Sequence, residues 1–328
     1  MSHRALITGI TGQDGSYLAD LLLEKGYEVH GIVRRTSSLE RSRLNHLYQN
    51  PEIFEHKLFL HYADLEDSTS LRRIFFKVVP EEIYHLAGQS HVGLGFSMSE
   101  VTCDLTAMGT LRLLEIIRDM PIAPRLFHAS SSEIFGKPEC ELQDETTPYW
   151  PVSPYGCAKA FATQMVKIFR ESYGLFATNG IMYNHESPRR GENFVTRKIC
   201  RAAAEIKLGR RDKLHLGNLD ARRDWGYAPD YVLGMWLTLQ EEKAGDYVFA
   251  TGESHSVRDL AALSFGALDL DWKDHVEVTP SLIRPDEPAM LMGNASKARR
   301  ELGWAPTCPF PKLISIMTHA DLAAFENG

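Results

Sequence analysis

Hydrophobic positions in the first half of the chain follow two alternating patterns. Short continuous apolar runs are typical of strands buried on both faces. They are followed by longer stretches in which apolar residues recur every three or four positions, as on one face of a helix. In residues 68–78, for example, Leu71, Phe75 and Val78 share such a face. The predicted strands are 4–8, 28–33, 58–62, 82–87, 125–130 and 176–183, and the predicted helices are 16–25, 68–78, 100–118 and 155–173.

This alternation predicts an α/β fold, because parallel strands joined by helical crossovers form a doubly wound parallel sheet of the Rossmann type. After about residue 184 the alternation ends, Pro, Arg and Asn become more frequent, and one further strand is expected at 247–251. We expect this part to form a smaller C-terminal domain. The expected division assigns 1–183 plus about 221–252 to the first domain and 184–220 plus 253–328 to the second, so that the two are interleaved.

Composition and charge exclude several classes of protein. With 328 residues, 44% of them hydrophobic and 24% charged, the chain has ordinary globular usage and length for about two domains. The net charge of −7 gives no basic field for a nucleic-acid backbone, and no apolar run approaches the roughly 20 residues that span a bilayer. The apolar stretch near the N-terminus is also too short for a signal peptide. We therefore expect a cytoplasmic protein with neither nucleic acid nor membrane as a partner.

Cysteine and histidine spacing argues against disulfides and metals. The five cysteines are odd in number, far apart and without a C-x-x-C pair: Cys103, Cys140, Cys157, Cys200 and Cys308. The 13 histidines include no H-E-x-x-H motif. The sequence therefore predicts neither a disulfide framework nor a metal site.

A glycine-rich segment follows the first predicted strand and opens the first helix. It reads Gly9-Ile10-Thr11-Gly12-Gln13-Asp14-Gly15. A tight turn without Cβ atoms lets a diphosphate approach the backbone and rest on the helix N-terminus, so the segment predicts a dinucleotide site. The spacing is G-x-x-G-x-x-G rather than G-x-G-x-x-G, and a strand–helix turn without a ligand is the alternative.

The end of the second strand indicates which dinucleotide binds. NAD sites usually carry Asp or Glu about 20 residues after the glycines, to hold a ribose hydroxyl. Here the strand ends in Arg34 and Arg35 with no acid, and guanidinium groups suit a 2′-phosphate, which favours NADP over NAD. A solvated basic loop is the alternative. The next two strand ends add candidates for the adenine edge and for close passage of the dinucleotide, namely Asp64 with Leu65 and Leu86 with Ala87.

Tyr155 and Lys159 lie four residues apart and therefore on one face of a predicted helix. A tyrosine with a pKa of about 10 is a poor base at neutral pH, but a lysine one turn away, helped by a positively charged nicotinamide, stabilises the phenolate. In isolation the pair could equally be a surface contact. Its position after the fifth strand of a dinucleotide-binding sheet favours a hydride-transfer site.

Hydroxyl groups and one carboxylate follow the fifth strand. Ser131 and Glu133 lie in the run 130–133, at the carboxyl end of the sheet, where open α/β folds bind ligands. For the serines, a loop start or helix cap is the alternative. A carboxylate beside a hydride-transfer site can remove the proton α to a newly formed ketone and then protonate a departing hydroxyl. Oxidation alone would not need that carboxylate.

Taken together, these residues resemble the GDP-mannose 4,6-dehydratase family of the extended short-chain dehydrogenase/reductase superfamily, along nearly the whole chain. The segments that carry the resemblance are ALITGITGQDGSYL at 5–18, QSHV at 89–92, SPYG at 153–156, NHESPRRG at 184–191, NFVTRK at 193–198, LGNLD at 216–220, RDWG at 223–226 and RP at 284–285 with Glu287. Those from residue 184 onward are more specific than the glycine turn. The resemblance implies that the smaller domain binds substrate.

The resemblance implies a reaction on GDP-mannose in three parts. Tyr155 would take the proton of the sugar C4 hydroxyl while hydride passes from C4 to NADP⁺. Glu133 would remove the C5 proton, the C6 hydroxyl would leave as water, and the hydride would return to C6. Lys159 would hold the nicotinamide ribose, and Ser131 would hydrogen-bond to O4. The product would be GDP-4-keto-6-deoxymannose.

The resemblance also implies binding residues and assembly. Besides the glycine turn, the NADP site would include Arg34, Asp64, Leu65, Gln89, Ser90, His185 and Arg190. The GDP-sugar site would include Ser90, Ser131, Glu133, Asn184, Val195, Lys198, Leu216, Gly217, Asn218, Arg223, Arg284 and Glu287. Basic side chains suit an anionic diphosphate, and a carboxylate suits the edge of guanine. Because family members assemble as dimers or tetramers, a homodimer or homotetramer is expected.

Three alternatives stay open at this point. A GDP-4-keto-6-deoxymannose reductase or a 4-epimerase would keep Tyr155 and Lys159 without needing Glu133. A non-enzymatic NADP-sensing protein would be expected to lose Tyr155 or Lys159, and both are present. A GDP-mannoheptose 4,6-dehydratase is the third, because Ser131 stands where many relatives carry threonine and Val101 where many carry tyrosine.

Overall fold

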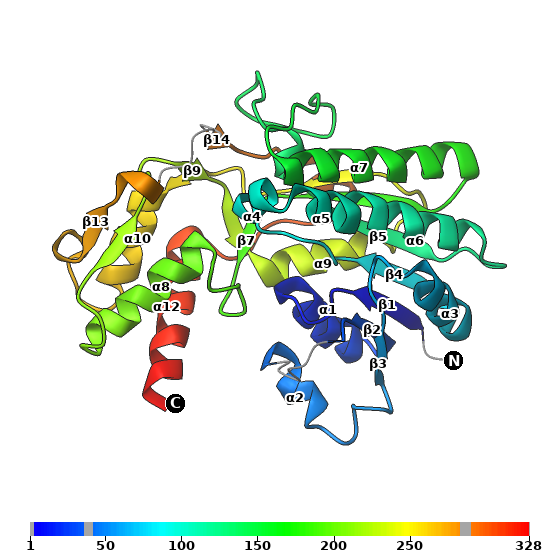
Figure 1. Cartoon of the computed structure of the whole chain (residues 1–328), viewed down its shortest axis with the longest axis horizontal. Coiled ribbons are helices and arrows are strands. Elements are labelled where there is room, and N and C mark those ends of the chain that lie inside the picture. The colour runs from blue at the N-terminus through cyan, green and yellow to red at the C-terminus, as the bar shows by residue number, and fades with distance from the viewer. Residues whose placement is uncertain (1–2, 36–41, 283–289, 328) are drawn as a thin grey trace.

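The computed structural model describes residues 3–35, 42–282 and 290–327, and this part of the chain contains a seven-stranded parallel sheet (Figure 1). The strand order is β11-β6-β5-β4-β1-β2-β3. Chain order reverses beside β1, which is where doubly wound sheets bind ligands. The strands are β1 (Arg4–Thr8), β2 (Glu28–Val33), β3 (Leu58–Tyr62), β4 (Glu82–His85), β5 (Arg125–Ser131), β6 (Ala177–Met182) and β11 (Asp246–Phe249).

Helices cover both faces of this sheet. On one face, α1 (Gln13–Glu24) and α9 (Ala228–Thr238) share a hydrophobic core with the strands. On the other face, a second core joins α3 (Ser68–Val78), α6 (Gly109–Arg118) and α7 (Pro154–Tyr173). This arrangement confirms the predicted Rossmann-type fold.

The predicted elements of the first half agree with the structure except near their ends. The bounds of β1, β2, β3 and α3 are as predicted. Helix α1 begins earlier than expected, at Gln13, because the glycine turn closes directly into its first turn through a hydrogen bond from Gly12 N to the Gly9 carbonyl (2.9 Å). Strand β4 ends at His85, and Leu86 and Ala87 then turn to line a cavity.

The helix expected at 100–118 is continuous but not uniform. It consists of α5 (Ser99–Cys103), a π-helical segment at Asp104–Met108, and α6. A π-helical segment is wider than an α-helix and is common near functional sites. Here Leu105 lines the cavity, whereas Leu113 and Leu114 of α6 are fully buried in the core.

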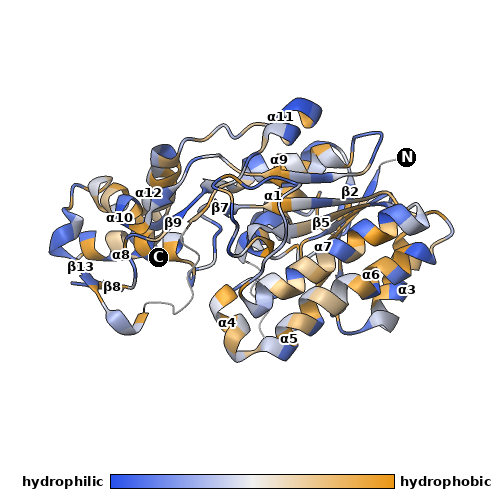
Figure 2. Ribbon diagram, turned by 90° about the horizontal axis from the view of Figure 1, so that it is seen from above, coloured by the Kyte–Doolittle hydropathy of each residue, from blue (hydrophilic) through white to orange (hydrophobic). Residues whose placement is uncertain are grey.

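A smaller lobe, seen beside the sheet in Figure 2, carries short strands. They are β7 (Asn184–Glu186) paired with β10 (Trp225–Tyr227), β8 (Leu214–Leu216) with β13 (Val276–Val278), and β9 (Arg222–Arg223) between β12 (His255–Ser256) and β14 (Met290–Leu291). The sequence predicted none of these strands, because two or three residues carry no readable period.

The core of this lobe is helical and separate from the sheet. It joins α8 (Val195–Lys207), α10 (Val257–Gly266) and α12 (Phe310–Asn327). Helix α11 (Ser296–Leu302), by contrast, packs with Trp304 against the sheet core and α9. Within the described residues, no helix is both long and apolar enough to cross a membrane.

The remaining short elements lie in connections. They are the 3₁₀ turns at Ser42–Leu44, Ser132–Ile134, Trp272–Asp274 and Pro280–Leu282, and the helices α2 (Asn45–Tyr48) and α4 (Val92–Ser97).

Candidate active site

A cavity of about 920 Å³ lies at the carboxyl ends of the sheet strands and extends to the smaller lobe. Every site residue predicted from the sequence and described by the structure lines it, with one exception: Arg35 does not. Arg284 and Glu287 lie outside the described residues. The structure thus brings together predicted site residues from 9 to 223 around one cavity.

The glycine turn is too tight for side chains. A Cβ on Gly15 would lie 2.3 Å from the Gly9 carbonyl oxygen, and one on Gly9 would lie 2.9 Å from Ala87 N. Gly9 also has a positive φ of 76°. Among the described residues no side chain caps the start of α1, which begins at the cavity, so its backbone N–H groups suit an anion.

The part of the cavity beside β3 has an unsatisfied buried acceptor. Asp64 Oδ1 is buried without a hydrogen-bond partner among the described residues, at the turn after β3. An amino group such as that of adenine would supply the missing donor. Arg34, exposed at the end of β2, lines the same cavity. These features and the glycine turn fit a dinucleotide.

Tyr155 occupies the first turn of α7, whose start is fixed locally. Ser153 caps the helix by accepting from Gly156 N (3.0 Å), and Pro154 follows the cap, as is common at helix starts. Burial raises the pKa of Tyr155 to about 12; a hydrogen bond with Ser131 opposes this, and the charge of Glu133 adds to it. The chain's own groups therefore hold the phenol protonated.

Lys159 lies one turn further along α7. Its Nζ donates to the Ala129 carbonyl (2.6 Å) and lies 5.9 Å from the centre of the Tyr155 ring. Burial lowers the pKa of Lys159 to about 8. The expected lowering of the tyrosine pKa by lysine is not seen in the chain alone, because the ammonium is turned to the carbonyl rather than to the phenol oxygen.

Glu133 follows Ser131 in a 3₁₀ turn at the end of β5. The backbone N–H of Glu133 donates to Ser131 Oγ (3.3 Å), and this turn carries both side chains to the cavity. Glu133 and Tyr155 both line the cavity, and the charge of Glu133 helps to raise the pKa of the phenol. A proton acceptor and a phenol thus share one cavity.

A buried polar pair behind Lys159 was not predicted from the sequence. His85 contacts Thr8 Oγ1 (2.7 Å) and Thr110 Oγ1 (3.1 Å), and His128 contacts Asn179 Oδ1 (2.9 Å). Burial and the charge of Lys159 lower the pKa of His85 to about 3. Both imidazoles are therefore neutral and structural. His85 and His128 are register partners on the neighbouring strands β4 and β5, so their contact could be predicted only from the pairing of these strands.

The smaller lobe reaches the cavity through cationic side chains. Lys198 of α8 donates to the His215 carbonyl (2.9 Å), and Arg223 lies on β9. Both line the cavity.

Beside Arg223, the buried Asp224 joins three segments. Its carboxylate accepts from Thr251 N (2.9 Å), Thr251 Oγ1 (2.7 Å), Gly252 N (2.9 Å) and Gly293 N (3.3 Å). No local sequence pattern predicts this role of Asp224, because its partners are distant in the chain.

Within residues 3–35, 42–282 and 290–327, no three His, Cys, Asp or Glu side chains are grouped so that they could hold a metal ion.

Known structures share the whole fold. The dTDP-glucose 4,6-dehydratase DesIV of Streptomyces venezuelae, solved with NAD bound, superposes with a TM-score of 0.85 at 24% identity, covering 97% of this chain and 96% of that one. The RMD protein of Pseudomonas aeruginosa, complexed with NADPH, gives a TM-score of 0.80 at 20% identity, covering 98% of this chain and 100% of that one. At such identities the likeness establishes the fold.

Sequence relatives establish the family. GDP-mannose 4,6 dehydratase 1 of Arabidopsis thaliana is 53% identical over 97% of this chain and 89% of its own length. The human GDP-mannose 4,6 dehydratase is 50% identical over 99% of this chain and 92% of its own length. The family model described as GDP-mannose 4,6 dehydratase matches residues 6–317. The chain therefore belongs to the GDP-mannose 4,6-dehydratase family.

Proposed function

We propose that the protein is a GDP-mannose 4,6-dehydratase that converts GDP-D-mannose to GDP-4-keto-6-deoxy-D-mannose and water. Family membership supports the substrate. The observation that carries the reaction type is the carboxylate of Glu133 in the same cavity as Tyr155 and Lys159. An oxidoreductase without elimination needs the phenol and the ammonium but has no use for that acid.

We further propose that the cofactor is NADP. A nicotinamide dinucleotide fits the glycine turn and the unsatisfied Asp64 acceptor, and solved proteins of this fold bind NAD or NADPH. The preference for NADP rests on Arg34, which lines the cavity where a NAD site would place an acid. Arg35 is expected to contribute less than Arg34 to the preference for NADP, because it does not line the cavity.

In the proposed reaction, a bound nicotinamide would supply the acceptor for hydride from C4 of the sugar and the donor of hydride to C6. Tyr155 Oη takes the proton of the C4 hydroxyl, and Ser131 orients O4. The resulting ketone acidifies the C5 proton, which Glu133 removes and then delivers to the departing C6 hydroxyl, giving water. Once C6 has received hydride, the proton that Tyr155 took from O4 returns to C5, which completes the product. Lys159 would hold the nicotinamide ribose, and its charge would lower the Tyr155 pKa only together with that of a bound cofactor, because in the chain alone burial raises that pKa.

The rest of the proposal concerns the substrate side and the assembly. Lys198 and Arg223 would bind the GDP diphosphate, and the sequence resemblance adds Arg284 and Glu287 to that site. We propose the division predicted from the sequence, a cofactor domain of 1–183 plus about 221–252 and a sugar domain of 184–220 plus 253–328, with the difference that β9 and β10 lie in the smaller lobe. Within the sugar domain, α11 packs on the sheet core. A cytoplasmic homodimer or homotetramer is proposed from the resemblance.

The test is incubation of the purified protein with GDP-mannose, followed by mass spectrometry and NMR. We expect loss of one water without consumption of added cofactor. Replacing the acid in Glu133→Gln should slow water loss by about 10²–10⁴-fold, the usual scale for acid–base help. Glu139→Gln, an exposed acid in the same connection, is the matched control and should leave the rate unchanged.

Two other outcomes would redirect the proposal. Loss of water from GDP-mannoheptose alone would keep the mechanism and change the substrate. Oxidation of NADPH by a 4-keto sugar, with no water lost from either substrate, would make the protein a reductase. Full activity in Glu133→Gln would remove the role proposed for that carboxylate.

A further inference from the structure

Asp14 places a negative charge where the dinucleotide diphosphate is expected. It lies in the first turn of α1, lines the cavity, and its side chain is 23% exposed. Helix N-termini attract anions, but a carboxylate already there repels a second anion at short range. Gly12, Gln13 and Gly15 around it carry no charge, so the compensation has to come from another part of the chain.

His185 of β7 supplies the opposite charge. Its Nε2 lies 2.8 Å from Asp14 Oδ2, and its Nδ1 lies 2.7 Å from the carbonyl oxygen of Tyr183. Both partners are acceptors, and an imidazole can donate from both nitrogens only when it is doubly protonated. Burial lowers the pKa of His185, but the charge and hydrogen bond of Asp14 outweigh this and raise it above its ordinary value. The pKa of Asp14 is lowered, although burial opposes this.

Further hydrogen bonds fix the two partners relative to each other. Gln13 Nε2 donates to Asp14 Oδ1 and to the His185 carbonyl, both at 3.0 Å, and Gln13 Oε1 accepts from Ser187 Oγ at 2.8 Å. The His185 ring also stacks on Tyr231 of α9, with centroids 4.8 Å apart. The ion pair therefore has a defined geometry that joins β7 to the glycine turn.

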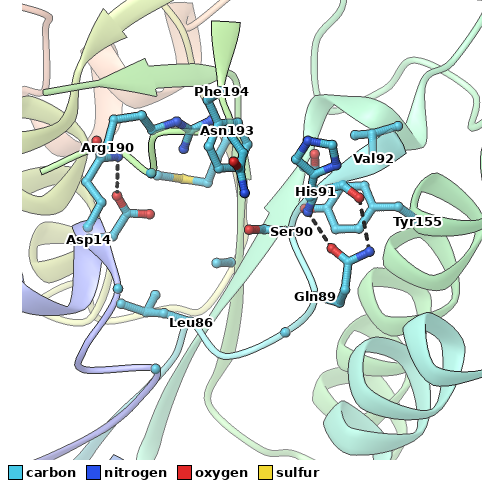
Figure 3. A pocket seen from close by; sticks show the side chains of 18 of the residues that line it. Asp14, Leu86, Gln89, Ser90, His91, Val92, Tyr155, Arg190, Asn193 and Phe194 are labelled. Atoms are coloured by element: carbon cyan, nitrogen blue, oxygen red, sulfur yellow. Dashed lines mark hydrogen bonds between the residues drawn. The ribbon is translucent and has the colours of Figure 1, made fainter. Parts of the chain in front are cut away.

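Two of the other charges that face this pair cancel each other. Arg190, on the same side of the cavity as Asp14 in Figure 3 and across from Tyr155, pairs with the buried Glu186 (Nε to Oε2, 3.1 Å). Burial raises the pKa of Tyr231 well above its ordinary value, so that phenol stays neutral. The charges of Asp14, His185, Arg190 and Glu186 thus sum to zero with a protonated His185 and to a negative value with a neutral one. Arg43, whose Nη1 donates to the Thr11 carbonyl (3.2 Å), adds a positive charge at the turn that does not depend on His185.

We propose that His185 is a positioning residue for the cofactor. As an imidazolium held between Asp14 and the Tyr183 carbonyl, it cancels the carboxylate charge at the start of α1 so that a diphosphate can bind there. Its side chain acts through Asp14 instead of touching the dinucleotide. The inference rests on the proposed function only in requiring a dinucleotide at the glycine turn.

The test is a charge cycle read out by binding of NADPH to the full chain. Fluorescence titration gives Kd at pH 7 for wild type, His185→Gln, Asp14→Asn and the double variant. Because His185→Gln leaves one uncompensated charge, we expect Kd to rise about tenfold, for a charge some ångströms from the diphosphate. Asp14→Asn should lose less affinity than His185→Gln, because no uncompensated carboxylate is left, and the double variant should recover affinity relative to His185→Gln.

A second series varies the pH from 7 to 9.5. The 2′-phosphate, whose second pKa is about 6, is fully ionised throughout. Lys159, with a pKa of about 8, titrates in this range in all variants, so the comparison between variants isolates His185. Wild-type affinity should fall more steeply with pH than that of His185→Gln or Asp14→Asn, because only wild type has an imidazolium to lose.

Weaker NADPH binding in the double variant than in His185→Gln would overturn the proposal. If the two side chains had only a structural role, the losses of affinity in the single variants would add. Equal pH profiles for wild type and Asp14→Asn would also overturn it, and this comparison serves even where His185→Gln fails to fold. Failure of the proposed function looks different: water loss would be absent while NADPH binding still followed the charge cycle.

Discussion

The sheet half and the smaller lobe line one cavity, but their site residues are positioned differently. In the sheet half the positioning contacts are short-range in the sequence, and in the lobe they join distant segments. In the sheet half, several site residues come at or directly after the end of a strand, as Arg34 follows β2 and Ser131 ends β5. In the lobe, Arg223 lies on a two-residue strand between β12 and β14. The first kind of site needs only local sequence to be placed, whereas the second needs contacts between distant segments.

This difference teaches where single substitutions should act. In the lobe, a hydrophobic core joins the helices, but the short strand at the cavity depends on buried polar groups such as Asp224. In the sheet half, position is set by backbone fit, since strand and turn already determine the path of the chain. Substitutions of the two kinds should therefore cost stability by different mechanisms.

The largest effect is expected at Asp224. Its replacement in Asp224→Ala would leave donors from Thr251, Gly252 and Gly293 without an acceptor, and we expect a loss of about 3–5 kcal/mol in the free energy of unfolding. Asp220→Ala is the control: that acid is exposed, pairs with Arg258 at the surface, and should cost less than about 1 kcal/mol. Denaturant unfolding measures both. Equal losses of unfolding free energy in the two variants would show that the lobe does not depend on the hydrogen bonds of Asp224.

A smaller effect is expected at the glycine turn. In Gly15→Ala the new Cβ would meet backbone atoms, the Gly9 carbonyl oxygen at 2.3 Å and Ile10 Cα at 2.6 Å. We expect a loss of about 1–3 kcal/mol, the scale of overpacking, together with weaker NADPH binding. Gly266→Ala should instead be neutral or stabilising by up to about 1 kcal/mol, since nothing among the described residues lies within 4 Å of that position in α10. Unchanged NADPH affinity in Gly15→Ala would contradict the tight-turn argument.

The smallest effect concerns cofactor choice. Arg34→Ala should weaken NADPH binding about tenfold and leave NADH binding unchanged, because a hydrogen bond to a charged phosphate is lost at an exposed position. Arg35→Ala should have a smaller effect, because Arg35 does not line the cavity. Binding titrations with both nucleotides measure this. Equal weakening of NADPH and NADH in Arg34→Ala would remove the argument for a 2′-phosphate contact.

Local sequence was sufficient for much of the sheet half. The apolar runs predicted β1, β2 and β3 with their bounds, and the spacing of Tyr155 and Lys159 predicted their common helix. Their effect on each other was harder to predict, because Lys159 is turned toward the Ala129 carbonyl by the end of β5, a contact between residues 30 apart.

The long-range polar contacts were not predicted from the sequence. No local sequence pattern predicts the pairing of His185 with Asp14 or the hydrogen bonds of Asp224, since each joins segments far apart in the chain. The lobe residues that line the cavity were named only through family resemblance. Periodicity carries information about buried faces, whereas a buried ion pair is specified by the fold that brings its partners together.

The π-helical segment at Asp104–Met108 holds about one residue more in its turn than an α-helix would between α5 and α6. Deleting one residue there would let the segment close to an α-helical turn, with the fully buried Leu113, Leu114 and Ile117 still facing the core. Inserting one residue would instead rotate these side chains by about 100°, the turn of one α-helical residue, and take them out of the core. This stretch should therefore tolerate a one-residue deletion better than a one-residue insertion.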